Sequence, residues 1–414
     1  MIAGAPGETG GVSLQLWNTA TRRKDPFSVG PEARFYVCGI TPYATTHLGH
    51  ARTYLIFDVL IKELERAGHA VRYCQNVTDV DDPLFDKALE LGKSVQEVAA
   101  EFTGIFKRDM AALGVRPPDF YPHASEEVDG MQRVIGDLID KELAYTRDGV
   151  TYFRSSRFPR YGQISKLDYD QMVAIARERG EDPSDRRKEY PLDFVLWKPS
   201  RPGEQSWPSP WGVGRPGWHI ECSAMALRYL GAELDVHGGG TDLIYPHHEH
   251  EAAQTESATG HSPFSRFWVH VEMVLLGGIK MSKSLGNLIL VRELTPTFDP
   301  RAIRRYLLET HYRSELDYSE ESLRCAAEEI RSLDRALALA PTAVPEGAWR
   351  EVADAFDSAL ADDLDTPGAL SCLSEATRLV LHTAAAPLSG AWATVLNAEA
   401  ELRAMAARLG LAPG

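Results

Sequence analysis

The sequence predicts an α/β fold in which a parallel sheet is followed by an all-helical C-terminal region. Residues 35–40 and 70–78 have the composition of β-strands, and residues 51–64 between them carry apolar side chains at helical spacing. This strand–loop–helix–strand pattern is typical of a parallel sheet. Residues 234–237 and 267–271 predict two more strands, and the chain after residue 290 is rich in Ala and Leu with helical spacing.

These elements divide the chain into four expected parts. We expect a loose N-terminal tail over residues 1–25 and a catalytic sheet domain over 26–290. An insertion at about 120–210 interrupts this domain, because the chain there is irregular and rich in Pro, Gly and charged residues. A helical region over 291–340 and a helical bundle over 341–414 complete the chain.

Composition indicates a cytoplasmic, globular protein. The 414 residues are 44% hydrophobic and 25% charged, and no apolar run is long enough to cross a bilayer. The N-terminus has neither the basic start nor the apolar stretch of a secretory signal. Five widely spaced cysteines argue against a disulfide framework and for a reducing compartment. We expect a monomer with no membrane partner.

Charge argues against nucleic acid as a partner. The formal net charge is −15, and residues 341–414 contain ten Asp or Glu against four Arg, a net charge of −6. No lysine follows Lys283. Phosphate contacts come mainly from Lys and Arg, so this region is poorly suited to binding RNA, and tRNA is not an expected partner.

Two short motifs predict a nucleotide site. His47-Leu48-Gly49-His50 lies where a strand passes into a helix, and Lys280-Met281-Ser282-Lys283-Ser284 follows the last predicted strand. A helix N-terminus favours polyphosphate, a glycine lets the nucleotide approach the backbone, and His and Lys side chains stabilise charge on a reacting phosphate. We expect ATP with Mg²⁺, with His47, His50, Lys280 and Lys283 as the catalytic residues. Alternatively, the first motif is a chance tetrapeptide and the second a solvated loop.

Four further residues form a candidate zinc site, one Zn²⁺ per chain. They are Cys38, Cys222, His247 and Glu251, the last two being four residues apart and therefore on one face if the segment is helical. Zinc binds a thiolate far better than a hydroxyl, so such a site would distinguish cysteine from serine. Alternatively, both cysteines are small buried hydrophobic residues and the His-rich run is a polar helix start.

The motifs together resemble the nucleotide-binding signatures of class I aminoacyl-tRNA synthetases. From about Val12 to Leu411 the chain is similar to cysteinyl-tRNA synthetases and to the related cysteine ligases of mycothiol biosynthesis. Besides the two motifs above, the shared segments are Cys38-Gly39, residues 76–82 (Asn-Val-Thr-Asp-Val-Asp-Asp), residues 217–222 (Gly-Trp-His-Ile-Glu-Cys), residues 237–243 (His-Gly-Gly-Gly-Thr-Asp-Leu), Pro246-His247-His248-Glu249 and residues 362–367 (Asp-Asp-Leu-Asp-Thr-Pro).

The resemblance implies a class I synthetase-type Rossmann (HUP-like) sheet with zinc at Cys38, Cys222 and His247. It implies cysteine contacts from Thr41, Thr53, Thr78 and Trp218, and adenosine contacts from Gly240, Thr241, Asp242 and the neighbourhood of Val274. The remaining residues expected around ATP and cysteinyl-adenylate are Gly39, Ile40, Asn76 and Val77.

Some features favour the mycothiol ligases and others the synthetases. Residues 38–43 and 82–85 are ligase-like, and residues 178–183 resemble a ligase motif with Glu181 in place of glycine. The chain also ends at Gly414, where synthetases continue with an anticodon-binding domain. Arg52, Glu251 and residues 254–260 instead resemble the synthetases. We therefore expect an ATP-dependent, AMP-forming ligase that joins L-cysteine to the amine of glucosaminyl-inositol (1D-myo-inositol 2-amino-2-deoxy-α-D-glucopyranoside). The alternative is a cysteinyl-tRNA synthetase that lacks the usual anticodon-binding domain.

Overall fold

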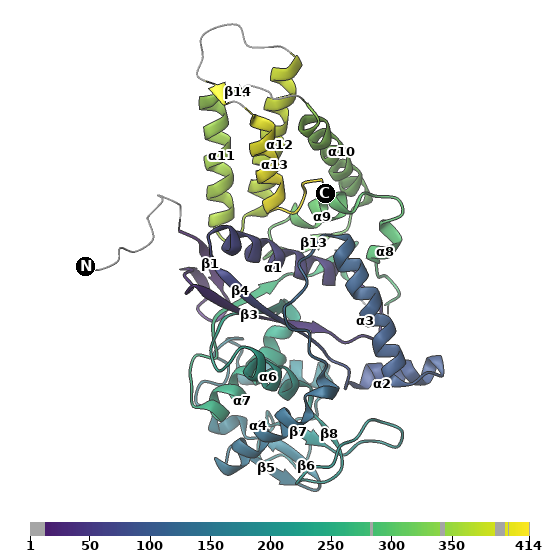
Figure 1. The fold of residues 1–414 in the computed structure, drawn as a ribbon. Helices are drawn as coiled ribbons and strands as arrows, with labels where there is room; N and C mark the ends of the chain where they lie inside the picture. The colour runs from purple at the N-terminus through teal and green to yellow at the C-terminus, as the bar shows by residue number, and fades with distance from the viewer. Residues whose placement is uncertain (1–12, 282–284, 340–343, 386–393, 396, 414) are drawn as a thin grey trace, which may run out of the picture.

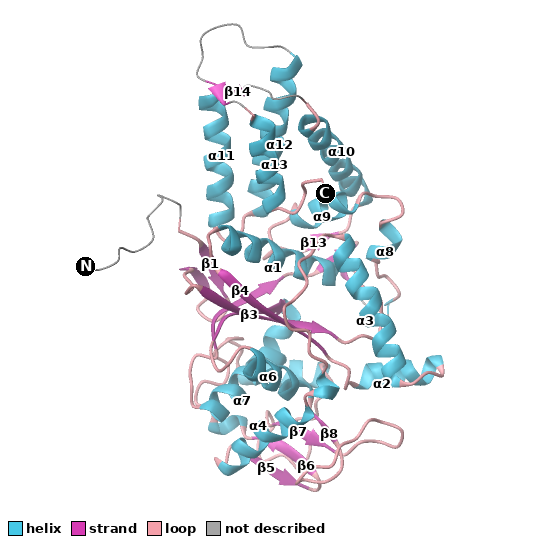
Figure 2. Cartoon of the chain, in the orientation of Figure 1, coloured by secondary structure: helices cyan, strands magenta, loops and turns pink. Residues whose placement is uncertain are grey.

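The computed structural model describes residues 13–281, 285–339, 344–385, 394–395 and 397–413. Its centre is a four-stranded parallel sheet of order β10-β9-β3-β4 (Figure 1). The strands are β3 (Glu32–Ile40), β4 (Ala70–Val77), β9 (Leu234–Gly240) and β10 (Ser265–Val271). Helix α1 (Leu48–Arg66) connects β3 to β4. The predicted α/β fold with a parallel sheet is therefore confirmed (Figure 2).

Each face of the sheet packs on a different layer, because successive strand residues point to opposite sides. On β3, Phe35 and Val37 belong to the hydrophobic core that contains α1, whereas Tyr36 and Cys38 belong to the core on the other face. That second core is completed by α4 (Val128–Asp140), α6 (Trp218–Tyr229) and α7 (Glu249–Thr259). Cys38 therefore points toward the helices that follow the insertion.

The segment between β4 and β9 forms a separate antiparallel sheet, at the lower end of the molecule in Figure 1. Its order is β5-β6-β7-β8, and three α-helices of this segment precede it in the chain. The further elements of this segment are α2 (Asp82–Leu91), α3 (Val95–Ala112), β5 (Ala144–Arg147), β6 (Val150–Phe153), α5 (Tyr169–Glu178), β7 (Phe194–Lys198) and β8 (Arg215–Pro216), of which β5, β6 and β7 contribute to the second core.

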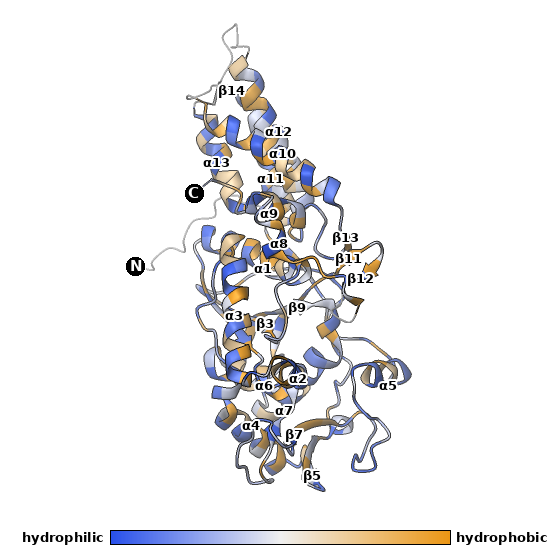
Figure 3. Ribbon diagram, turned by 90° about the vertical axis from the view of Figure 1, so that its right-hand side faces the viewer, coloured by the Kyte–Doolittle hydropathy of each residue, from blue (hydrophilic) through white to orange (hydrophobic). Residues whose placement is uncertain are grey.

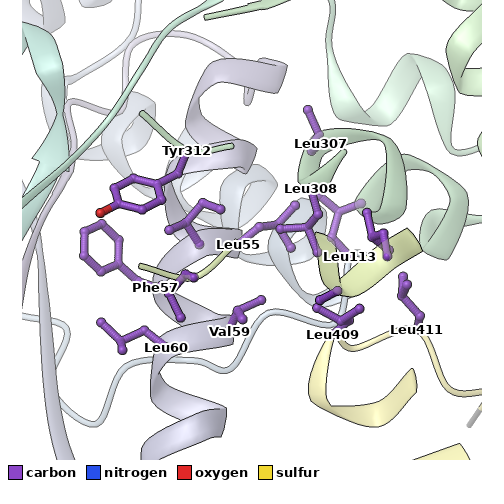
Figure 4. Packing of buried hydrophobic residues seen from close by; sticks show 14 of the residues in the cluster. Leu55, Phe57, Val59, Leu60, Leu113, Leu307, Leu308, Tyr312, Leu409 and Leu411 are labelled. Carbon is purple, nitrogen blue, oxygen red and sulfur yellow. The ribbon is translucent and has the colours of Figure 1, made fainter. Parts of the chain in front are cut away.

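The C-terminal helices pack directly on the sheet domain. Leu55 and Val59 of α1 face Leu307 and Leu308 of α9, and Leu409 lies against them (Figure 4). One hydrophobic core therefore includes residues of the sheet domain and residues of the described C-terminal helices. The helices are α8 (Val291–Leu294), α9 (Pro300–Leu308), α10 (Glu320–Leu337), α11 (Glu346–Ala361), α12 (Thr366–Ala385) and α13 (Ala398–Arg408).

The bundle helices carry both hydrophilic and hydrophobic residues, as expected for amphipathic helices (Figure 3). Five short strands in this part of the chain form a three-stranded sheet and a separate pair. They are β11 (Val274–Leu276) with β12 (Ile279–Lys280) and β13 (Leu316–Asp317), and β14 (Val344–Pro345) with β15 (Thr394–Val395). Within the described residues, no helix combines the length and apolarity that a membrane crossing requires.

The expected N-terminal tail differs from the structure over its described part. Strand β1 (Gln15–Asn18) pairs antiparallel with β2 (Arg23–Pro26). The Trp17 N–H donates to Asp363 Oδ1 at 2.7 Å, and Leu16 is fully buried. This hairpin is ordered by contacts with residues almost 350 positions away, which local sequence does not indicate.

Candidate active site

Four side chains from four different elements meet beneath the end of β3. Cys38 lies on β3, Cys222 on α6, His247 in the π-helical turn Ile244–His248 (η4), and Glu251 in the first turn of α7. Their Sγ, Nε2 or Nδ1, and carboxylate atoms all lie within 4.8 Å of one another. Cys38 Sγ is 3.9 Å from Cys222 Sγ, and Glu251 Oε1 is 3.1 Å from His247 Nε2. The predicted zinc-ligand residues are thus brought together.

The chemistry of this donor set fits zinc. Cys38, Cys222 and Glu251 are at most 5% exposed, and burial raises the pKa of each. A divalent cation among these groups would favour the thiolate and carboxylate forms that burial alone opposes. Thiolate sulfur, imidazole nitrogen and carboxylate oxygen are all ligand atoms that zinc binds in proteins.

A network of buried histidines surrounds the four residues, and sequence reasoning did not assign it. Six of the thirteen histidines are buried here: His219, His237, His247, His248, His250 and His270. His247 Nδ1 lies 2.9 Å from His219 Nδ1, and His248 Nδ1 lies 2.8 Å from His270 Nε2. Burial lowers the pKa of His237 and of His270 to about 3, so both are neutral. The run His247-His248-Glu249-His250 was the only local signal for this network.

A second donor combination shares two of these ligands. Cys38, His237, His248 and Glu251 also bring one ligand atom each within 4.8 Å. Cys38 Sγ is 3.3 Å from His248 Nε2, and Glu251 Oε2 is 3.0 Å from His237 Nε2. Cys38 and Glu251 therefore belong to both sets. Cys222 and His247 belong only to the first set, and His237 and His248 belong only to the second.

The His47 side chain caps helix α1. Its Nδ1 accepts hydrogen bonds from the N–H groups of Gly49 at 3.1 Å and His50 at 3.4 Å. The Leu48 N–H donates to Ile289 O, and the Ala51 N–H to His47 O. The first helical N–H groups are thus already bonded, which corrects the expectation that they are open to phosphate. Because Nδ1 accepts, the His47 proton lies on Nε2, which can donate to a ligand.

Gly49 has a different role from the one we expected. A Cβ at this position would lie 2.9 Å from the His47 ring, so the glycine makes room for the capping imidazole. The His47 and His50 rings stack with centroids 3.8 Å apart. Burial, with His50 adding to it, lowers the pKa of His47 to about 2, and burial lowers the pKa of His50 to about 4. Both histidines are therefore neutral hydrogen-bonding groups.

The lysine motif approaches this helix end from β12. Lys280 Nζ lies 3.3 Å from Asp242 Oδ2, which follows β9. The neighbouring Thr241 hydroxyl donates to Glu272 Oε2 at 3.0 Å. Lys280 and the loop after Gly240 therefore lie together, as a shared nucleotide site requires. Lys283, the other predicted catalytic lysine, lies outside the described residues.

Several residues expected around cysteine and cysteinyl-adenylate lie at the ends of β3 and β4, and Trp218 begins α6. Gly39 N–H donates to Asn76 Oδ1 at 2.8 Å, and Asn76 Nδ2 donates to Thr78 Oγ1 at 2.9 Å. A Cβ on Gly39 would lie 1.6 Å from the Asn76 carbonyl oxygen, so this approach requires glycine. The Trp218 ring stacks on His247 with centroids 4.2 Å apart. Backbone pairing connects Ile40 with Val77.

Three further expected site residues lie in α1, in β11 and in the loop after β3. Thr53 Oγ1 donates to Gly49 O at 3.2 Å, within its own helix. Val274 is 2% exposed and belongs to the hydrophobic core, so only its backbone could meet adenosine. Thr41 is half-buried in the loop after β3. Arg52, which we noted as synthetase-like, is fully buried and donates to five carbonyl oxygens between Glu272 and Ser314.

Comparison with known proteins identifies the family. Residues 27–328 match the family described as the tRNA synthetases class I (C) catalytic domain. The chain belongs to the cysteinyl-type class I tRNA synthetase family. It is 42% identical over 380 residues to a cysteine–tRNA ligase of Gloeothece citriformis, covering 88% of this chain and 78% of that protein.

Relatives named as a different ligase have similar sequence identity to this chain. A protein of Thermobispora bispora named L-cysteine:1D-myo-inositol 2-amino-2-deoxy-alpha-D-glucopyranoside ligase is 46% identical over 363 residues, covering 88% of this chain and 89% of that one. A ligase of the same name from Streptosporangium roseum is 45% identical over 361 residues, with 87% and 88% covered. All these class I relatives are ligases, so the predicted enzyme class is confirmed.

Solved structures agree on the fold. The Mycobacterium tuberculosis methionyl-tRNA synthetase in complex with methionyl-adenylate superposes with a TM-score of 0.62 at 17% identity, covering 84% of this chain and 82% of that one. At this identity the likeness concerns the class I fold alone, including the helical C-terminal region.

Proposed function

We propose that this enzyme activates L-cysteine with ATP and transfers the cysteinyl group to the amine of glucosaminyl-inositol. The activation step is supported by the meeting of Cys38, Cys222, His247 and Glu251. Cys38 lies near the end of β3, and the His47–His50 motif lies at the start of α1, which follows β3. Zinc bound by the four residues would supply selective affinity for the substrate thiolate. The relatives named as cysteine ligases agree with this assignment.

In the first step the cysteine carboxylate attacks the α-phosphate of ATP. A C–O–P bond forms, and the bond to pyrophosphate breaks. Nε2–H of His47 donates to phosphate oxygens, and Lys280 adds positive charge, so both stabilise the charge that develops in the transition state. No general base is needed, because the attacking carboxylate is already ionised. Mg²⁺ bound with ATP would add further charge neutralisation.

In the second step the acceptor amine attacks the carbonyl carbon of cysteinyl-adenylate. A C–N bond forms, AMP leaves, and the amine proton passes to solvent. Amide formation in this manner matches the reaction named for the Thermobispora and Streptosporangium relatives. The net charge of −6 over residues 341–414 also favours a small acceptor over a polyanion.

Transfer to tRNA(Cys) is the second candidate function. The match to the class I (C) catalytic domain and the 42% identity to the Gloeothece cysteine–tRNA ligase favour it. In that case the ribose hydroxyl of the terminal adenosine would attack the same carbonyl and give an ester.

Two assays test the proposal in order. Cysteine-dependent ATP–pyrophosphate exchange reports the first step, and no exchange with the zinc-loaded protein would reject both candidates. The second assay supplies glucosaminyl-inositol and tRNA(Cys) separately and detects an alkali-stable amide or an alkali-labile ester. We expect the amide; charging of tRNA alone would reject the amine acceptor and leave activation intact.

A further inference from the structure

A cavity of about 590 Å³ opens between the insertion and the end of β4, beside the donor set of Cys38, Cys222, His247 and Glu251. Its volume falls within the range of about 300–1,000 Å³ that is usual for small-molecule sites. The insertion supplies one wall through residues 179–188 and 195–199, and Asp81, Asp82 and Trp218 supply the other. Sequence reasoning assigned no chemistry to the insertion.

The cavity touches both ends of the site at which cysteinyl-adenylate is proposed to bind. Trp218 in its wall stacks on His247 of the donor cluster, with ring centroids 4.2 Å apart. Arg179 in the opposite wall donates from NH2 to the carbonyl oxygen of Asp242 at 3.4 Å, next to the proposed adenosine loop. The carbonyl group of cysteinyl-adenylate must lie between the cysteine thiol at the donor cluster and the adenosine at the loop after Gly240. A ligand in the cavity therefore lies beside this carbonyl group.

The lining is charged but balanced. Five carboxylates and five Lys or Arg side chains face the cavity, so their formal charges cancel. Most of them are paired with one another: Asp185 is 2.8 Å from Arg187, and Asp82 is 3.1 Å from Lys198. Fixed donors and acceptors without net charge suit the hydroxyl groups of a polyol, and the Trp218 ring offers an apolar platform for a sugar ring. A polyphosphate would require an excess of cations.

Glu181 is a carboxylate of this lining whose contacts are all long. Its nearest described partners are Lys188 Nζ at 3.4 Å, His219 Nε2 at 3.7 Å and His250 Nδ1 at 4.0 Å. All three distances are longer than the about 2.7–2.9 Å that is usual for charge-assisted hydrogen bonds. His250 is 1% exposed, and its Nδ1 has no hydrogen-bond partner among the described residues. The carboxylate thus has room for one further donor.

We infer that this cavity is the acceptor subsite and that it takes a small polyol whose one ionisable group is an amine, with the amine nitrogen bound to Glu181. The inference rests on the proposed amine acceptor. It adds the location of the acceptor, the class of molecule that fits, and the residue that recognises the amine before it attacks the carbonyl.

The test uses the full, zinc-loaded chain and steady-state kinetics with glucosaminyl-inositol. For Glu181→Gln, the fold-increase in the acceptor KM should be at least about ten times the fold-change in the rate of cysteine-dependent pyrophosphate exchange. Asp185→Asn, at another position of the lining, should also raise the acceptor KM. The matched control is Glu178→Gln, an exposed residue of α5 outside the lining, which should behave as wild type in both assays.

A competition experiment separates recognition of the amine from a general loss of structure. The acceptor analogue with a hydroxyl group in place of the amine serves as inhibitor. Wild type should bind the amine more tightly than this analogue, and Glu181→Gln should reduce that preference at least about fivefold. If wild type makes the amide but Glu181→Gln and Asp185→Asn keep the wild-type acceptor KM, the subsite is wrong. If wild type exchanges pyrophosphate but makes no amide, the proposed function fails first.

Discussion

His219 and His247 are joined through their Nδ1 atoms, which lie 2.9 Å apart. Nε2 of His247 faces the other donors, at 3.1 Å from Glu251 Oε1. A metal bound at Nε2 leaves the His247 proton on Nδ1, where it donates to His219. The buried His219 ring therefore holds the His247 imidazole in the tautomer and orientation that a metal ligand needs.

His219→Ala should lower zinc affinity by about 10–100-fold, the usual effect of removing a partner of a metal-bound imidazole. Competition against a chromophoric chelator measures this directly. His261→Ala is the matched control, since His261 pairs with Glu233 in a half-exposed contact outside the cluster. Equal zinc affinity in both variants would contradict the role of His219.

Cys222→Ser should reduce both zinc occupancy and the preference for cysteine over serine. Zinc binds a hydroxyl much more weakly than a thiolate, so the variant loses one of the two sulfur ligands. We expect at least about a hundredfold fall in cysteine-dependent pyrophosphate exchange, together with metal loss seen by elemental analysis. Cys325→Ser, an exposed cysteine of α10, should leave both unchanged. Retention of zinc by Cys222→Ser with wild-type exchange would favour ligation by His237 and His248 instead.

Lys280→Gln should slow the activation step with little change in cysteine binding. Its ammonium group lies at the nucleotide end, 3.3 Å from Asp242. Loss of a charge that stabilises the transition state costs about 10²–10³ in rate. The exchange rate at saturating ATP should fall by this factor, whereas Lys93→Gln, an exposed lysine of another ion pair, should not change it. A rise in the KM for ATP alone would indicate ground-state binding only.

The main elements were predictable because their signals are local. Alternating and helical spacing of apolar residues predicted β3, α1, β4, β9 and β10, and residue chemistry predicted the meeting of Cys38, Cys222, His247 and Glu251. The β1–β2 hairpin was not predicted, because it depends on Asp363, which adopts φ +61° and binds the Trp17 N–H. Such long-range partners leave no periodic pattern.

Two features of the site were also beyond local patterns. The capping of α1 by His47 uses the side chain that the motif suggested for phosphate, and the choice between these roles depends on the ring orientation. The acceptor cavity exists only because the insertion folds back against Trp218 and Asp81. Both walls contain segments that the sequence analysis noted, residues 178–183 on one side and residues 76–82 and 217–222 on the other, but their sequence does not show that they face each other.

Gly39→Ala should disrupt the cysteine pocket. A Cβ at residue 39 would lie 1.6 Å from the Asn76 backbone oxygen, so β3 and β4 would have to separate at their ends. We expect a loss of about 2 kcal/mol or more in the free energy of unfolding and a raised KM for cysteine. Gly136→Ala in α4 is the matched control, because a Cβ there meets nothing within 4 Å. That change should stabilise the protein by about 0.5–1 kcal/mol. Chemical denaturation of both variants measures the contrast.

The buried pair of Asp58 on α1 and Arg304 on α9 joins the sheet domain to the bundle. Arg304 is fully buried and Asp58 is 2% exposed. Arg304 also donates to Leu113 O at 3.2 Å, and Asp58 Oδ1 accepts from the Arg116 N–H at 2.8 Å. Burial raises the pKa of Asp58, but Arg304 and Lys62 outweigh it, so the pKa is lowered overall.

Asp58→Asn should therefore destabilise the protein by about 3–5 kcal/mol, because it leaves a buried guanidinium without its counter-charge. The sign of the pH dependence follows from the lowered pKa. Asp58 stabilises the fold fully above the pKa of the unfolded carboxyl, about 3.9, and loses this contribution as pH falls through its lower folded value. The difference in unfolding free energy between wild type and Asp58→Asn should be constant near neutral pH and shrink below about pH 4. Asp86→Asn, an exposed carboxyl of α2, serves as control. A difference that grows on acidification would show that the carboxyl is protonated in the folded protein.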